Sequence, residues 1–136
     1  MGKLRINMRE LKFRYWNPIA KTYKMSWRYN LTHDGKILAY DVDMMGYDEP
    51  TDPKNSALVI QQWTGCYDKN GVEIYEGDIV KVYSEEFENE NFTGKVIFDE
   101  GSFLTWINKN DIRGVWSGDN IEVIGNIMEN HELLKA

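Results

Sequence analysis

Short runs rich in apolar, β-branched and aromatic residues recur along this 136-residue chain, and in places apolar and polar residues alternate with a period of two. Residues Leu11 to Trp16 show the pattern, because Leu, Phe and Tyr there alternate with Lys, Arg and Trp. This period is typical of β-strands that bury one face. Strands are predicted at residues 11–16, 23–31, 37–42, 57–63, 72–75, 79–83, 95–98, 103–107 and 121–124. The run 57–63 also fits a short helix, but its Val59, Ile60 and Trp63 favour a strand.

Short segments of turn-forming residues separate the predicted strands. His33 to Lys36, Asp68 to Gly71 and Asp99 to Ser102 each combine an Asp with a glycine. The Asp side chain can accept hydrogen bonds from nearby backbone N–H groups, and the glycine tolerates a positive φ. Such short turns join antiparallel neighbours.

These elements indicate a mainly β fold made of short antiparallel strands. In the C-terminal half, the strand 79–83, a variable connection and the hairpin at 99–102 follow an order similar to that of SH3-like barrels, which is an analogy of pattern. We therefore expect a small SH3-like-barrel-type C-terminal half. Residues His131 to Leu134 predict a short C-terminal helix of a single turn, with Asn130 as its N-cap.

The length favours a single domain that spans residues 1–136. Residues 43–56 contain a glycine and two prolines and are predicted to form a linker or a long loop. They would separate an N-terminal β lobe, residues 8–42, from a C-terminal barrel-like lobe, residues 57–136. The pattern is compatible with one shared core and with exchange of the two lobes between subunits.

One stretch of the chain is distinctive. It contains Trp63-Thr64-Gly65, then Asp68 to Gly71, and then Ile74-Tyr75-Glu76-Gly77-Asp78-Ile79-Val80. Together with an opening segment, Met8 to Trp16, and a closing segment, Ile121 to Asn130, it resembles the pattern of the YopX family. Members of this family are small proteins encoded by phages and prophages of bacteria. The resemblance extends from Met8 to near the end of the chain.

The resemblance implies a phage-related origin and a location in the cytoplasm of a bacterial host. It carries no agreed catalytic residues, so it assigns no role to individual side chains. Two segments depart from the family pattern. Residues Met1 to Asn7 precede its usual start, which makes Met8 a candidate initiator, and residues 43–56 match no part of it.

Charge and composition narrow the classes of function. The chain has 16 Lys and Arg against 22 Asp and Glu, which is a formal net charge of −6. Binding to duplex DNA is therefore not expected, because phosphate contacts need clustered basic residues. Basic residues gather near the N-terminus, and acidic residues gather in Glu85 to Glu90. No apolar run is long enough to span a membrane, so no membrane partner is expected.

The residues that could bind a metal are few or wrongly spaced. Residues from Asp68 onward superficially resemble a calcium-binding loop, but Ile79 stands where a bidentate Glu should close it. The two histidines, His33 and His131, are too far apart in the sequence to form a metal-binding pair. We predict no metal site and no cofactor.

Residues for catalysis are equally poorly placed. The single cysteine, Cys66, rules out an intrachain disulfide and has no base near it in the sequence. The carboxylates Glu73, Glu76 and Asp78 lie close along the chain, but a strand-entry turn at Glu76-Gly77-Asp78, whose side chains cap backbone N–H groups, is a better explanation than acid–base chemistry. We predict no catalytic residues and no enzymatic activity.

Two function classes fit these observations. The first is a non-enzymatic protein-interaction module that binds itself, as a homo-oligomer, or a bacterial host protein. Aromatic residues are 13% of the chain, and Tyr and Trp are enriched at interfaces; the nominated surface residues are Tyr83, Trp106 and Trp116. The alternative is a single-stranded nucleic-acid-associated β-barrel module, in which aromatic rings would stack on bases.

Overall fold

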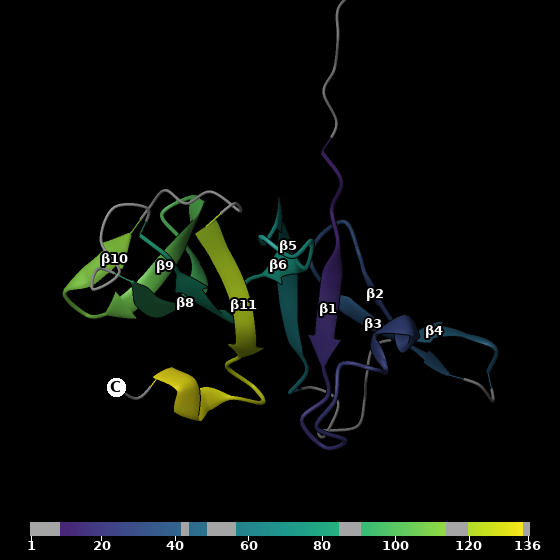
Figure 1. The fold of residues 1–136 in the computed structure, drawn as a ribbon. Coiled ribbons are helices and arrows are strands. Elements are labelled where there is room, and N and C mark those ends of the chain that lie inside the picture. Colours follow the sequence, from purple (N-terminus) through teal and green to yellow (C-terminus); the bar gives the residue numbers. More distant parts are fainter. Residues whose placement is uncertain (1–8, 42–43, 49–56, 85–90, 114–119, 135–136) are drawn as a thin grey trace, which may run out of the picture. The chain divides into compact units, whose positions relative to one another are not determined.

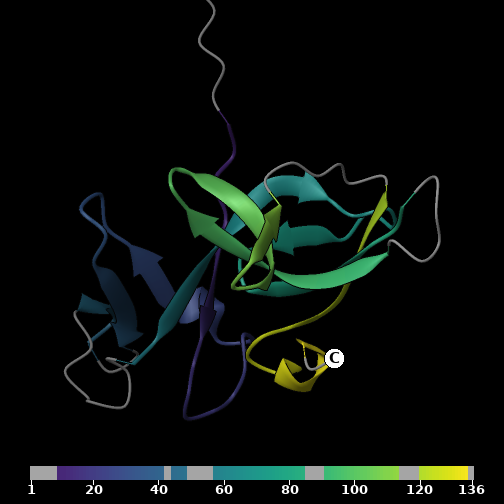
Figure 2. The same cartoon turned by 90° about the vertical axis from the view of Figure 1, so that its left-hand side faces the viewer.

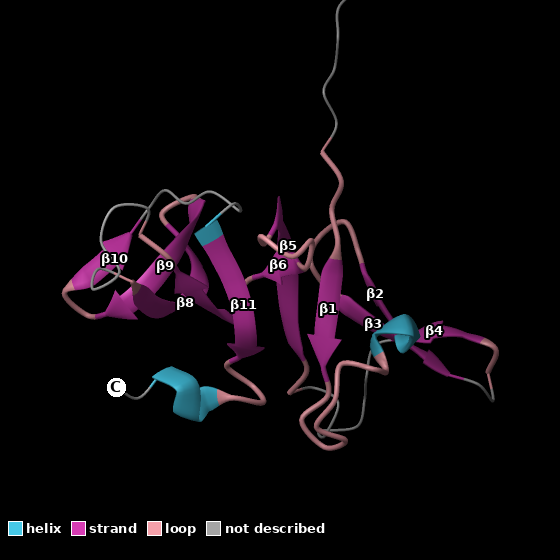
Figure 3. Cartoon of the chain, viewed as in Figure 1, coloured by secondary structure: helices cyan, strands magenta, loops and turns pink. Residues whose placement is uncertain are grey.

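The computed structural model describes residues 9–41, 44–48, 57–84, 91–113 and 120–134. By its contacts the chain divides into two compact units. We call residues 13–61 the 13–61 unit, and residues 1–12 with 62–136 the C-terminal unit. Figure 1 labels the strands other than β7, and Figure 3 shows that strands predominate. The fold is therefore mainly β and antiparallel, as the sequence predicted, and its helices are short 3₁₀ turns within the described residues.

The 13–61 unit contains β1 (Phe13–Trp16), η1 (Ser26–Arg28), β2 (Tyr29–Leu31), β3 (Ile37–Asp41) and β4 (Gly46–Asp48). The last three form an antiparallel sheet in the order β2-β3-β4 (Figure 1). Its buried side chains are largely aromatic. Tyr15 and Tyr29 pack with ring centroids 5.5 Å apart, and the side-chain amide of Asn17 donates a hydrogen bond of 3.1 Å to the Tyr29 hydroxyl. Aromatic rings bury enough area to supply a core in so small a unit.

The predicted strand 23–31 is wrong over most of its length. Only Tyr29–Leu31 is a strand, and Ser26–Arg28 forms the 3₁₀ turn η1. The Ser26 hydroxyl donates to the Tyr23 carbonyl at 2.7 Å and accepts from the Tyr15 N–H at 3.0 Å. A serine that bonds nearby backbone in this way competes with the extended conformation. The aromatic composition of this segment therefore predicted a longer strand than the backbone adopts.

Strand β4 falls inside the segment that the sequence predicted as a linker, residues 43–56. Gly46 and Asp48 are poor strand formers, so the pattern gave no signal there. The strand is held by pairing with β3, in which Tyr40 and Tyr47 are opposite each other with ring centroids 5.2 Å apart. Residue 43 and residues 49–56 of the predicted linker lie outside the described residues.

Strand β5 (Val59–Tyr67) is the middle strand of a sheet in the order β1-β5-β6. Its residues 59–61 belong to the 13–61 unit, and its remainder belongs to the C-terminal unit. In that unit it pairs with β6 (Glu73–Tyr75), through Trp63 opposite Tyr75 and Tyr67 opposite Glu73. The strand assignment for 57–63 is thus confirmed over the helical alternative.

The C-terminal unit also contains a five-stranded antiparallel sheet in the order β10-β9-β8-β7-β11. Figure 2 shows its teal, green and yellow strands from another side. Its strands are β7 (Asp78–Val82), β8 (Phe92–Asp99), β9 (Ser102–Asn108), β10 (Asp111–Arg113) and β11 (Ile121–Asn126). No closed barrel is found within the described residues, and β10 and β11 are the edges of an open sheet. The likeness to SH3-like barrels stays a prediction from pattern.

The core of the C-terminal unit consists of aliphatic side chains. Its members are Ile74, Val80, Val82, Val96 and Ile121. They come from β6, β7, β8 and β11, so one layer of side chains ties these strands together. The predicted C-terminal turn is present as η4 (His131–Leu134), which lies against β8. The N–H of Leu133 donates to the carbonyl of Asn130 at 2.9 Å.

The turns predicted from Asp and Gly residues are confirmed in detail. One carboxylate oxygen of Asp68 accepts the N–H groups of Asn70 at 2.8 Å and Val72 at 2.9 Å, and Gly71 has φ +81°. At the tip of the β8–β9 hairpin, Glu100 and Gly101 both have positive φ. Two successive residues with positive φ are characteristic of a type I′ turn, whose twist matches that of the strands it joins.

Candidate interaction surface

The two faces of the five-stranded sheet carry different side chains, and the strand register assigns each residue to its face. Lys81 in β7 pairs with Glu122 in β11 and with Thr93 in β8. Lys95 in β8 pairs with Ile79 in β7 and with Trp106 in β9. Because paired residues lie side by side and successive side chains alternate, these side chains share the face opposite the valine core.

Trp106 is supported on this face by its strand neighbours. The Lys95 ammonium group lies 4.5 Å from the centroid of the Trp106 ring, and Ile112 of β10 is its register partner on the other side. An ammonium group above an indole is attracted by the negative face of the ring. The ring is half-buried and is held between a charge on one strand and an apolar side chain on the next.

Tyr83 follows β7 and is held in a similar way. Its hydroxyl donates a hydrogen bond of 2.8 Å to the Glu122 carboxylate. The ammonium groups of Lys69 and Lys81 lie 4.1 Å and 5.1 Å from the ring centroid, and Lys69 also forms an ion pair of 3.5 Å with Glu122. The hydrogen bond to Glu122 raises the pKa of the Tyr83 hydroxyl above its usual value, so the neutral phenol is the form that this contact favours.

We call Lys69, Lys81, Tyr83, Lys95, Trp106 and Glu122 the lysine–aromatic face. Two of the three nominated surface residues, Tyr83 and Trp106, belong to it, on either side of β8. Trp116 lies outside the described residues. Sequence reasoning missed the lysines, although the alternation in β7 and β8 contained the signal. Lys81 is two residues from Tyr83, so alternation alone places both on one face. Lys95 comes next to Trp106 only through the pairing of β8 with β9.

The turn at 68–71 fastens one edge of the sheet. The second carboxylate oxygen of Asp68 accepts the N–H of Val123 at 2.9 Å, and the N–H of Lys69 donates to the Ile121 carbonyl at 2.9 Å. Burial by itself would raise the pKa of Asp68, but three hydrogen bonds from backbone N–H groups and the nearby Lys69 charge hold that pKa below its usual value. The turn therefore forms hydrogen bonds along the edge of β11 and places the Lys69 side chain beside the Tyr83 ring.

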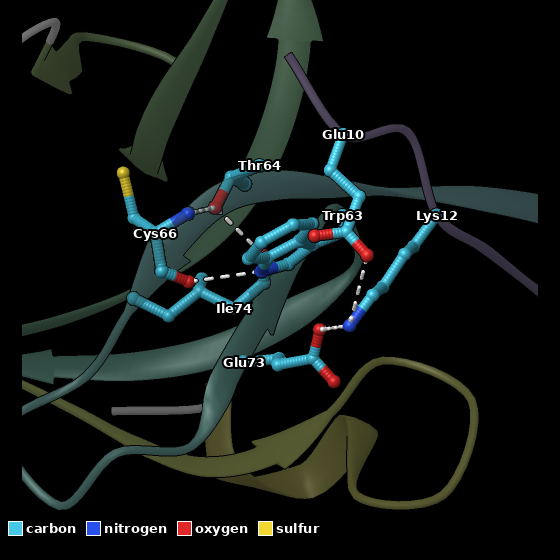
Figure 4. Close-up of polar contacts among 7 residues, drawn as sticks. All are labelled: Glu10, Lys12, Trp63, Thr64, Cys66, Glu73 and Ile74. Carbon is cyan, nitrogen blue, oxygen red and sulfur yellow. Dashed lines mark hydrogen bonds and ion pairs between the residues drawn. The ribbon is translucent and has the colours of Figure 1, made fainter.

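Neighbouring residues of β5 and β6 form a second polar cluster (Figure 4). The Trp63 indole N–H donates to the Cys66 carbonyl at 3.1 Å, and the Thr64 hydroxyl donates to the Ile74 carbonyl at 2.7 Å. The Lys12 ammonium lies 2.9 Å from a carboxylate oxygen of Glu73 and 4.9 Å from the centre of the Trp63 ring. The hydrogen bond to Glu73 raises the pKa of Lys12. These contacts hold the hairpin and its neighbouring segment together.

A shallow hollow of about 120 Å³ adjoins this cluster. It is lined by Arg9, Glu10, Leu11, Gln62, Trp63, Thr64 and Gly65. The volume is well below the several hundred Å³ of a typical small-molecule site. The hollow can take a single side chain of a partner at most.

Comparison with known proteins agrees with these observations. The family model described as YopX protein matches residues 12–135. The chain belongs to the YopX family.

Two solved structures share its fold. Protein EF1440 from Enterococcus faecalis has a TM-score of 0.61 and 26% sequence identity, over 94% of this chain and 100% of that one. Protein yopX from Bacillus subtilis has a TM-score of 0.60 and 22% identity, over 90% and 97%. No curated protein matches the chain in sequence.

The structure gives physical roles to the residues by which the sequence resembled the YopX family. Asp68 to Gly71 is the turn that bonds the backbone of β11, and the Thr64 hydroxyl joins β5 to β6. The Trp63 indole bonds the Cys66 carbonyl within β5. The side chain of Asp78 accepts the N–H of Tyr75 at 2.8 Å, and that of Glu76 accepts the N–H of Gln62 at 2.8 Å. The prediction that these carboxylates cap backbone amides is therefore confirmed.

Other chemistry in the described part of the chain is limited. No three His, Cys, Asp or Glu side chains there are grouped so that they could hold a metal ion. Cys66 is exposed and has a free thiol. The described residues include no helix with the length and apolar character needed to cross a membrane.

Proposed function

We propose that this YopX-family chain is a non-enzymatic protein-interaction module of phage or prophage origin that acts in the bacterial cytoplasm. The observation that carries the proposal is the lysine–aromatic face. Trp106 lies in β9 and Tyr83 directly follows β7, both outside the aliphatic core, and each ring contacts a lysine ammonium group or forms a hydrogen bond.

Rings held in this way suit a binding surface. A Trp or Tyr that is already fixed in one orientation loses little rotamer freedom when a partner covers it, while it still buries a large area. Residues of this type are enriched among those that dominate binding energy at interfaces. The sheet underneath supports this role, because a packed core positions the rings more accurately than a loop would.

The arrangement of Asp68, one of the buried carboxylates, supports a structural role for it over a catalytic one. A general acid at neutral pH needs a raised pKa. Asp68 has a lowered pKa, because its carboxylate accepts three backbone N–H groups. Its position is explained by support of the turn and of β11.

The proposed partner is a bacterial host protein or a second copy of this chain, and capture from host lysate tests the first. The tagged full chain is incubated with nuclease-treated lysate, and retained proteins are identified by mass spectrometry. We expect a specific partner that Trp106→Ala releases and Trp27→Ala retains. Trp27 is a matched control, because it is 67% exposed and belongs to the 13–61 unit.

The captured protein is then purified and titrated against the chain and both variants. Equal binding by Trp106→Ala and the parent chain would overturn the assignment of this face. Self-association is tested by sedimentation velocity over a concentration series. A mass that rises with concentration in the parent chain, and not in Trp106→Ala, would name a second copy as the partner.

Single-stranded nucleic acid is the second candidate partner, and the lysines of the face favour it. Lysines beside aromatic rings on a sheet are the elements that sequence-tolerant single-strand binders use. Titration with a labelled 12-nucleotide oligothymidylate over a salt series tests it. Affinity that falls steeply with salt would support this candidate, and binding that Trp106→Ala leaves unchanged would contradict it.

A further inference from the structure

We propose that the lysine–aromatic face receives a short, extended and acidic segment of a partner protein. This inference rests on the proposed function, that the face binds protein, and adds the chemistry of what it binds. Its starting point is the difference between the charge of the face and the charge of the chain.

The face has more positive than negative groups. Lys69, Lys81 and Lys95 contribute three ammonium groups, and Glu122 contributes the carboxylate among them. That carboxylate is already engaged, because it accepts the Tyr83 hydroxyl and pairs with Lys69.

Lys81 and Lys95 are the groups that a partner would neutralise. Neither makes an ion pair within the described part of the chain, and their contacts there are with the rings of Tyr83 and Trp106. The register partners of Lys95 are Ile79 and Trp106, which carry no charge. A partner carboxylate would therefore find two ammonium groups on adjacent strands.

The chain as a whole carries a formal charge of −6, so this face is a local exception. A complementary potential steers an anionic segment toward the face and suppresses binding elsewhere on the surface. Complementarity of charge thus selects an acidic partner.

The contacts of the rings favour an acidic peptide over nucleic acid. Base stacking needs an open ring face, and ammonium groups already lie 4.1 Å from the Tyr83 centroid and 4.5 Å from the Trp106 centroid. A polynucleotide would also extend beyond the three lysines, where an acidic chain repels it. A segment with two to four carboxylates has no such excess of charge.

The strand order predicts how long the bound segment is and where its acidic and apolar residues lie. Lys95, Trp106 and Ile112 are in register on β8, β9 and β10, and the fully buried Ile79 completes their row on β7. Lys81 lies two residues from Ile79 along β7, beside Thr93 of β8. Adjacent strands are about 4.8 Å apart, so this row spans about 15 Å, which about five extended residues cover. Acidic residues would lie over the lysines, and an apolar residue would lie beside Trp106 and Ile112. Ile112 is 47% exposed, so a partner can cover it.

A designed peptide tests the inference directly with the full chain. The probe is a fluorescein-labelled six-residue peptide with four glutamates followed by two leucines. The same peptide with glutamines in place of the glutamates is its control, and fluorescence anisotropy is measured at 50 and 200 mM salt. We expect the acidic peptide to bind at least tenfold more tightly than its control, and to weaken as salt rises.

Two double variants locate the binding. Lys81→Gln with Lys95→Gln should weaken the acidic peptide at least tenfold. Lys24→Gln with Lys109→Gln changes the net charge equally at two exposed lysines off the face, and it should alter affinity less than twofold. Circular dichroism and urea unfolding confirm that both variants fold.

The remaining outcomes separate this inference from the proposed function. Binding of the 12-nucleotide oligothymidylate without the peptide would overturn the inference in favour of nucleic acid. Equal weakening by both double variants would overturn it as unspecific charge attraction. If the peptide does not bind while Trp106→Ala still releases the captured partner, the inference fails and the proposed function stands.

Discussion

The two faces of the five-stranded sheet are built from the same strands and differ in almost every chemical respect. One face is aliphatic and closed, with Val80, Val82, Val96 and Ile121 buried beneath it. The other face has lysines and aromatic rings that remain partly accessible, together with Ile79, which is fully buried beside Lys95. Alternation with period two allows this division, because each strand contributes to both faces at once. Stability is therefore expected to depend on the first face, and binding on the second.

The largest expected effect is on the core face. Ile121 is 1% exposed, so Ile121→Ala leaves a cavity and should lower the free energy of unfolding by about 3 kcal/mol. Urea denaturation followed by Trp fluorescence measures the loss. The control is Ile112→Ala on the opposite face, where we expect about 0.5 kcal/mol or less. Similar losses for the two variants would contradict the division of roles.

Gly94 tests how closely the strands approach on the core face. A Cβ atom there would lie 2.7 Å from the backbone oxygen of Trp106 and 2.8 Å from a methyl group of Thr105. Backbone must shift to admit it, so Gly94→Ala should cost about 2 kcal/mol. Gly46→Ala is the control, because its nearest contact would be at an ordinary 3.8 Å. A neutral Gly94→Ala would mean that β8 and β9 can separate without loss.

Asp68 lies at the edge of the sheet and should affect both faces together. Asp68→Asn replaces an acceptor of three backbone N–H groups with an amide that cannot accept them all, which should cost about 1.5 kcal/mol at pH 7. It should also weaken peptide binding, because Lys69 is positioned by the same turn.

The pH dependence of this loss has a definite sign. The folded-state pKa of Asp68 is lowered, so its contribution is present above its unfolded pKa and is lost as pH falls through the folded value. The difference between the parent chain and Asp68→Asn should be constant from pH 7 to about pH 5 and shrink below about pH 4. A difference that grows on acidification would refute this account of the carboxylate.

The smallest stability effect is expected on the lysine–aromatic face. Lys81→Gln with Lys95→Gln removes ammonium groups from the rings of Tyr83 and Trp106. Partly exposed contacts of this kind contribute about 0.5 kcal/mol each, so the double variant should lose about 1 kcal/mol or less in urea denaturation. A loss as large as that of Ile121→Ala would show that this face is also structural.

The turns and strands that depend only on residues close together in the sequence were predicted correctly. The turn at 68–71 and the hairpin at 99–102 need only an Asp, a glycine and their own backbone, and both were predicted correctly. Eight of the nine predicted runs coincide largely with strands, and β-branched and aromatic residues were the main signal in runs such as Ile37–Asp41 in β3. The aromatic segment before Tyr29 failed because the Ser26 hydroxyl bonds the backbone of Tyr15, a residue outside the local window.

The candidate site was predictable in part. Tyr83 and Trp106 were nominated as exposed aromatics on strands, which is a property of residue type. The lysines above their rings were not predicted, because Lys69 comes from a turn and Lys95 from another strand. The short strands β4 and β10 gave no signal either, since three residues are too few to show a period.

The sequence by itself determined the β class of the fold, the positions of its main turns and the membership of the YopX family. These depend on alternation, on glycine and Asp at turns, and on a specific string of residues. Only the tertiary structure decided that Asp68 reaches Val123 of β11, and that Lys95 lies beside Trp106. Strand order and register are set by pairing between distant segments, so the face that a lysine shares with a ring is known only once the strands are in place.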